Sequence, residues 1–131
     1  MAREAVIVST ARTPIGKAHR GAFNATAPDR LAAHVMNAAV DRAGIDPDRI
    51  DDVIFGVGNQ YGPQFYNLAR MSVFTAGLPK TLPATSIDRK CASGLTAIAF
   101  AARSIMSGDA DAMLAGGVES VSSTRLPGLP D

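Results

Sequence analysis

The segment 91–106 constrains the fold of this 131-residue chain more than any other part of it. Its residues are nearly all small or apolar, and the only interruptions are Ser93, Thr96, Arg103 and Ser104. A helix that is apolar on most of its sides is a buried helix, covered from more than one direction. Gly108 is a suitable C-terminal stop. The sequence therefore predicts a central buried helix, whose outer side needs a second apolar layer from another domain or another subunit.

The only cysteine, Cys91, stands at the start of this helix, directly after the short extended segment 83–87. The free backbone N–H groups and the dipole at a helix start favour a thiolate over a thiol, and the thiolate is the nucleophile. A lone cysteine in an apolar segment is, however, more often a small core residue. Position alone therefore leaves two interpretations of Cys91, a catalytic nucleophile and a core residue.

Short apolar runs alternate with helical patterns along the chain. Four runs have the pattern of buried strands, over residues 5–8, 53–57, 84–87 and 112–115. One helical stripe precedes the second strand, at Leu31, Val35, Ala38 and Ala39. Another follows it, at Phe65, Leu68, Ala69, Ser72 and Ala76. The order β-α-β-α-β-α-β predicts an α/β fold with a mainly parallel sheet and right-handed crossovers.

Three other polar residues are candidates for function. His19 and His34 could act as bases, but neither has a carboxylate and a nucleophile near it in sequence, so both are interpreted as structural or surface residues. Arg70 could neutralise a phosphate, or it could face solvent or a partner subunit. The pair at 16–17 (GK) is not a phosphate-binding loop, because the upstream glycine and the following Ser or Thr are missing.

Composition excludes several classes of protein. Charged residues make up 19% and hydrophobic residues 47% of the chain, which is typical of one globular domain. A net charge of +1, with scattered Lys and Arg, argues against binding to nucleic acid or to an anionic membrane. We expect neither a signal peptide nor a membrane span. A single cysteine cannot form a disulfide within the chain, and no other metal-binding residues stand close to it in sequence at the spacing of a metal site. A cytoplasmic protein is expected.

Four segments give the chain a resemblance to a known family. They are residues 11–17 (ARTPIGK), 67–70 with 76–79 (NLAR and AGLP), 91–97 (CASGLTA), and 108–111 leading to 115–122 (GDAD and AGGVESVS). In this order they resemble the N-terminal part of the thiolases, the acetyl-CoA acyltransferase family. The resemblance covers nearly the whole chain. The related ketoacyl synthases also place a cysteine at a buried helix start, but the residues around it differ.

The resemblance implies that residues 1–131 are an N-terminal thiolase-like domain, without the C-terminal half and without most of the CoA-binding loop domain. It implies thiolytic cleavage of 3-ketoacyl-CoA, as in β-oxidation of fatty acids, or the reverse Claisen condensation. Cys91 would be the nucleophile that carries the acyl group, and its backbone N–H would contribute to an oxyanion hole. Acyl-CoA and CoA would be substrates, with no metal or other cofactor. Homodimers or tetramers would pair through the strand Ala84–Ile87.

Two kinds of departure accompany the resemblance. Asp88 stands where many thiolases have Asn, and Thr96 where Gln or Arg is frequent. Asp88 could cap the helix, but a carboxylate pointing at Cys91 would oppose thiolate formation. Thiolases also use a histidine and a second cysteine from the C-terminal half, and neither His19 nor His34 matches that histidine. We therefore expect little turnover from this chain alone. The alternative is a non-catalytic remnant, or an assembly subunit that pairs with thiolase-like partners.

Overall fold

The computed structural model describes residues 3–124. Its strands are β1 (Asp52–Gly56), β2 (Ala84–Ile87) and β3 (Met113–Gly117). Its α-helices are α1 (Pro28–Ala43), α2 (Leu68–Thr75) and α3 (Ser93–Ser107). Short 3-10 helices lie in the connections: η1 (Pro47–Arg49), η2 (Gly62–Gln64), η3 (Lys90–Ala92) and η4 (Val121–Ser123).

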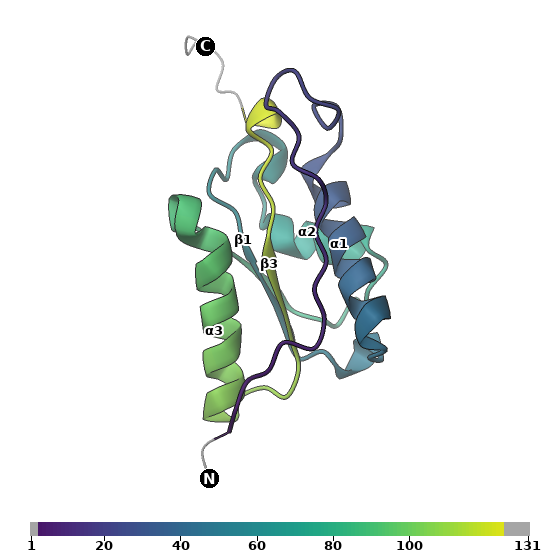
Figure 1. Cartoon of the computed structure of the whole chain (residues 1–131), viewed down its shortest axis with the longest axis vertical. Helices are drawn as coiled ribbons and strands as arrows, with labels where there is room; N and C mark the ends of the chain where they lie inside the picture. Colours follow the sequence, from purple (N-terminus) through teal and green to yellow (C-terminus); the bar gives the residue numbers. More distant parts are fainter. Residues whose placement is uncertain (1–2, 125–131) are drawn as a thin grey trace.

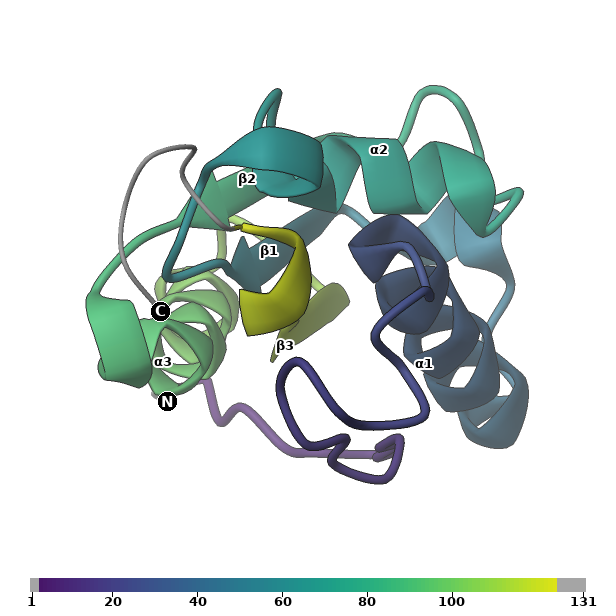
Figure 2. The same cartoon turned by 90° about the horizontal axis from the view of Figure 1, so that it is seen from above.

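The three strands form a parallel sheet in the order β2-β1-β3. Val53 of the central strand lies opposite Ala84 on one side and Leu114 on the other. Helix α3 covers one face of the sheet, and α1 and α2 cover the other (Figures 1 and 2). The predicted α/β fold is confirmed. Because all three strands run in the same direction, the loops that follow them meet at one edge of the sheet.

The main core lies between β1 and the pair α1 and α2. Val53 and Phe55 of β1 are buried in it together with Met36 of α1 and Val73 of α2. The stripe predicted for α1 is only partly buried. The buried face is shifted by one residue along the helix, to Ala32, Ala33, Met36 and Val40. Residues 31–40 are apolar in almost every direction, so spacing alone did not determine which side would face the core.

The strand predicted over residues 5–8 does not form. Its apolar side chains Val6, Ile7 and Val8 are 72%, 74% and 75% exposed. The segment runs beside β3 in Figure 1, and Arg3 Nη2 contacts Asp111 Oδ1 at 2.5 Å. Within residues 3–124, no backbone hydrogen bond joins this segment to β3. A strand needs a neighbouring strand to satisfy its backbone groups, and none of the described residues provides one here.

Helix α3 packs on the sheet through a face of small residues: Ser93, Thr96, Ala97 and Ala101 are buried. Large apolar residues of α3 are also exposed: Leu95, Ile98, Phe100 and Met106. The predicted lack of a polar outer face is therefore a feature of the structure, although no part of residues 3–124 covers it. No helix in the described range is both long and apolar enough to cross a membrane.

Candidate active site

Cys91 lies in η3, between the carboxyl end of β2 and the first residue of α3. The helix proper therefore begins at Ser93, slightly later than predicted. The Cys91 side chain is exposed, so the interpretation of Cys91 as a core residue does not fit the structure. Parallel α/β sheets bind ligands beyond the carboxyl ends of their strands, and this is where the thiol lies.

The turn that carries Cys91 has a strained backbone. Lys90, which precedes it, has φ 50°, in the left-handed region that residues other than glycine rarely adopt. The buried Ser93 hydroxyl closes the turn, because it accepts from Arg89 N at 2.8 Å and donates to Lys90 O at 2.6 Å. Left-handed backbone costs about 1 to 2 kcal/mol and persists where its surroundings hold it, as at many functional sites.

Asp88 is turned toward Lys90. Its Oδ1 accepts from Lys90 N at 2.7 Å, and its Oδ2 accepts from Lys90 Nζ at 2.6 Å. The hydrogen bond from the Lys90 side chain is the main reason that the pKa of Asp88 lies below its ordinary value, and the same bond raises the pKa of Lys90. Asp88 thus closes the 3-10 turn instead of capping α3. The carboxylate is paired with Lys90, so the condition under which it would oppose a thiolate, a side chain directed at Cys91, is not met.

Replacing Asp88 is expected to change how stability depends on pH. Because the folded-state pKa of Asp88 is lowered, its contribution is fully present above its unfolded value of about 3.9 and is lost as the pH falls through the folded value. We expect urea unfolding to show a smaller loss of stability below about pH 4 in Asp88→Asn than in the wild type. Asp41→Asn, exposed on α1, is the control and should follow the wild type. Parallel pH profiles for wild type and Asp88→Asn would contradict this.

The loops that follow β1 and β3 meet beside this turn at Gln64, which is fully buried. Its Oε1 accepts from Ser120 N at 2.5 Å, and its Nε2 donates to Asn59 O and to Glu119 Oε1. Glu119 Oε2 accepts from Gly58 N at 2.8 Å. No pattern in the sequence indicated a role for Gln64. Glu119 did stand in a segment that carried the family resemblance, which is the one signal that pointed here.

The other candidate residues lie elsewhere or have structural roles. His34 is exposed on α1, and His19 is exposed in a loop where its backbone N donates to Ser122 Oγ at 2.8 Å. No hydrogen bond joins either of these described side chains to Cys91. Arg70 donates to the carbonyls of Leu82 and Lys80 and lies 4.3 Å from the centre of the Phe74 ring. It therefore fixes the loop before β2, a role that the sequence did not indicate.

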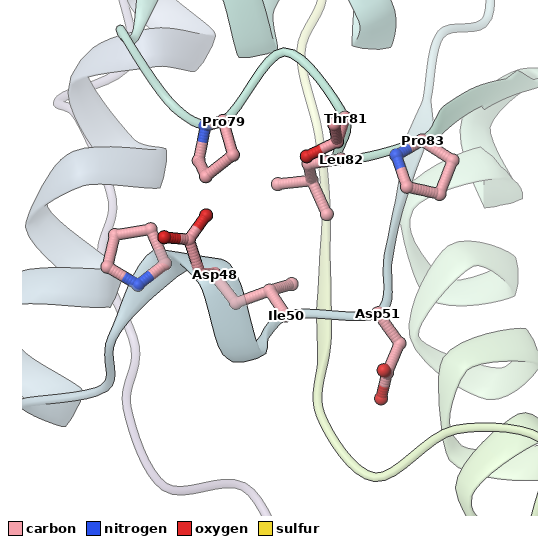
Figure 3. Close-up of a pocket in the computed structure, with 8 residues that line it drawn as sticks. Asp48, Ile50, Asp51, Pro79, Thr81, Leu82 and Pro83 are labelled. Carbon is pink, nitrogen blue, oxygen red and sulfur yellow. The ribbon is translucent and has the colours of Figure 1, made fainter.

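A shallow hollow of about 200 Å³ lies at the opposite end of the strands, where β1 and β2 begin (Figure 3). Its lining includes Ile50 and Asp51, just before β1, and Pro83, just before β2. Asp51 Oδ2 accepts from the backbone N of Ala112 and of Asp111, and these bonds, the one from Ala112 first, lower the pKa of Asp51. This carboxylate is thus used to hold the start of β3. Within residues 3–124, no group of three or more His, Cys, Asp or Glu could hold a metal ion.

Comparison with known proteins identifies the family. The family model described as the N-terminal domain of thiolase matches residues 5–127. The chain belongs to the thiolase family. A 3-ketoacyl-CoA thiolase of Bacillus subtilis (strain 168) is 45% identical over 126 residues, which are 96% of this chain and 32% of the relative. A 3-oxoadipyl-CoA/3-oxo-5,6-dehydrosuberyl-CoA thiolase of Escherichia coli (strain K12) is 47% identical over 121 residues, 92% of this chain and 30% of the relative.

A solved structure agrees with this thiolase assignment. The crystal structure of the Bacillus anthracis acetyl-CoA acetyltransferase superposes with a TM-score of 0.88 at 38% sequence identity. The match covers 95% of this chain and 31% of that chain. The thiolase chain described here thus spans about a third of the length of the relatives that it matches.

Proposed function

We propose that this thiolase chain contributes the acyl-accepting cysteine of an acyl-CoA acyltransferase, and that Cys91 is this residue. One observation carries the proposal above the others. In a chain of the thiolase family, the exposed thiol lies in a strained turn at the carboxyl edge of a parallel sheet, where a helix begins. A helix start supplies backbone N–H groups that stabilise a thiolate and a developing oxyanion.

The reaction follows from covalent catalysis by a thiolate. Cys91 Sγ attacks the 3-keto carbonyl of a 3-ketoacyl-CoA, the bond between C2 and C3 breaks, and the C2 carbanion takes a proton to leave as acetyl-CoA. The acyl group remains on Sγ as a thioester, and the thiol of CoA then removes it and returns the proton. Each step runs backward in the Claisen condensation. CoA is a substrate here, and the proposed chemistry needs no metal or redox cofactor.

Relatives support the substrate class. Those from B. subtilis and E. coli are named for 3-ketoacyl-CoA and 3-oxoadipyl-CoA, both of which are 3-ketoacyl thioesters of CoA. We therefore propose 3-ketoacyl-CoA substrates, in fatty acid breakdown by β-oxidation or in a related degradative route. One relative, from Arabidopsis thaliana, is named as peroxisomal. For the present chain we propose the cytoplasm, the location expected from its sequence.

The sheet edge at β2 supports a homo-oligomer. Among the described strands, β2 pairs only with β1, so its second edge has no strand partner. An unpaired edge is a template for a strand from another chain. We propose that two copies pair through Ala84–Ile87, within a homodimer or tetramer.

A chimera tests the proposed activity. Residues 5–127 replace the matching segment of the B. subtilis relative, and CoA-dependent loss of acetoacetyl-CoA is measured. We expect thiolysis by the chimera, and a rate at least about 10³-fold lower for the 131-residue chain alone, because none of the described side chains forms a hydrogen bond with the Cys91 thiol and could act as its base. A chimera that folds and binds CoA but gives no thiolysis would refute the proposal.

The second candidate function is an assembly unit without catalysis. The exposed apolar side of α3, with Leu95 73% exposed, favours it because such patches mark contact surfaces. An inactive but folded chimera, together with self-association of the chain in sedimentation experiments, is the result that would favour assembly over catalysis.

A further inference from the structure

The loop after β3 is anchored to a buried amide near the cysteine turn. Gln64 is fully buried, and both the oxygen and the nitrogen of its side-chain amide form hydrogen bonds. The oxygen accepts from Ser120 N, and the nitrogen donates to Asn59 O and to Glu119 Oε1. Breaking one of these bonds would leave a buried polar group without a partner, which is costly. Although Glu119 is itself exposed, the bond from Gln64 holds its carboxylate in one position.

Gly58 connects the Glu119 carboxylate to the turn that carries Cys91. Its N–H donates to Glu119 Oε2 at 2.8 Å, and its carbonyl accepts from Lys90 Nζ at 2.8 Å. A Cβ added at Gly58 would lie 2.8 Å from Glu119 Oε2 and 3.2 Å from Lys90 O. The three residues are therefore packed without spare room, and a shift of Glu119 would move the backbone against which Lys90 rests.

Lys90 depends on such contacts, because its left-handed backbone is unfavourable by itself. Its ammonium group contacts Asp88 and Gly58, and the charge of Glu119 adds to that of Asp88 in raising the pKa of Lys90. Lys90 also directly precedes Cys91, so any change in its φ redirects the thiol.

We propose that Glu119, anchored by Gln64, is a positioning residue for Cys91. By accepting a hydrogen bond from the Gly58 N–H, it holds the Gly58 loop in contact with Lys90 and so maintains the left-handed turn that presents the thiol. The importance of this role for turnover rests on the function proposed above. Glu119 acts through Gly58 and Lys90, and it is not assigned a contact with substrate.

The test uses the 131-residue chain with three substitutions. Glu119→Ala removes both acceptor atoms, and Glu119→Gln keeps one acceptor for the Gly58 N–H. Ser72→Ala is the control, because Ser72 is fully buried and donates to Leu68 O within α2, away from the turn. For each folded variant, we would record the backbone chemical shifts of Lys90 by NMR and the rate of Cys91 alkylation by iodoacetamide at one mildly alkaline pH.

In Glu119→Ala we expect the Lys90 shifts to leave left-handed values and the alkylation rate to change by about tenfold. Glu119→Gln should lie between Glu119→Ala and the wild type, and Ser72→Ala should match the wild type in both readouts. Unchanged Lys90 shifts and an unchanged rate in folded Glu119→Ala would overturn the positioning role. Neither readout requires acyl-CoA, so failure of the proposed acyltransferase function would appear separately, as an inactive chimera with Glu119 intact.

Discussion

Gly56→Ala is expected to lower the free energy of unfolding by about 3 kcal/mol or more, which is a large part of the stability of a small domain. A Cβ at position 56 would lie 2.3 Å from Gly94 N and 2.3 Å from Ser93 C. Both atoms belong to the backbone of the first turn of α3, so no side-chain rotation can relieve the clash. The end of β1 and the start of α3 would have to separate, and the turn that holds Cys91 would move with them. Urea unfolding followed by circular dichroism measures this loss.

Gly94→Ala is the matched control for Gly56→Ala. The nearest atom to a Cβ at position 94 is Gly116 O, at 4.0 Å, so a methyl group fits there. Because alanine favours a helix over glycine, we expect unchanged stability or a gain of up to about 1 kcal/mol. Equal stability of Gly56→Ala and Gly94→Ala would contradict the close contact between β1 and α3.

Cys91→Ser in the chimera is expected to lower kcat for thiolysis by at least about 10³-fold, because a hydroxyl is far less acidic and less nucleophilic than a thiol. Cys91 is exposed and packs little, so the folded structure should be retained. The assay is the same loss of acetoacetyl-CoA, with circular dichroism to confirm folding. Ser107→Ala, at the other end of α3, is the control and should keep nearly full activity. A Cys91→Ser chimera that retains even a tenth of the activity would show that the acyl group is carried elsewhere.

The sequence predicted those parts of the fold that local patterns determine. Strands β1, β2 and β3, and the apolar outer side of α3, follow from runs and spacings that a single stretch of chain contains. The strand predicted over residues 5–8 was wrong, because an apolar run forms a strand only beside a partner strand and no described strand pairs with this one. The face of α1 that is buried was also undetermined, since its residues from 31 to 40 are apolar on several sides.

The candidate site was likewise predictable from the sequence only in its local features. Cys91 could be found from the sequence because the only thiol coincides with a strand-to-helix junction. The contacts of Gln64 with Glu119, 55 positions away, and of Lys90 with Gly58, 32 positions away, depend on how the parallel strands bring their loops together. The direction of the Asp88 carboxylate was equally open until the left-handed turn at Lys90 was known.

Transfer of the acyl group to Cys91 can be detected by mass spectrometry of the chimera after acid quenching in the presence of acetyl-CoA. Trypsin cleaves after Lys90 and Arg103 and therefore releases Cys91 in one peptide, residues 91–103. We expect an added acetyl group on this peptide, located at Cys91, which disappears when CoA is added before the quench. An active chimera with no acetyl group on this peptide, or with the acetyl group on another residue, would contradict this expectation.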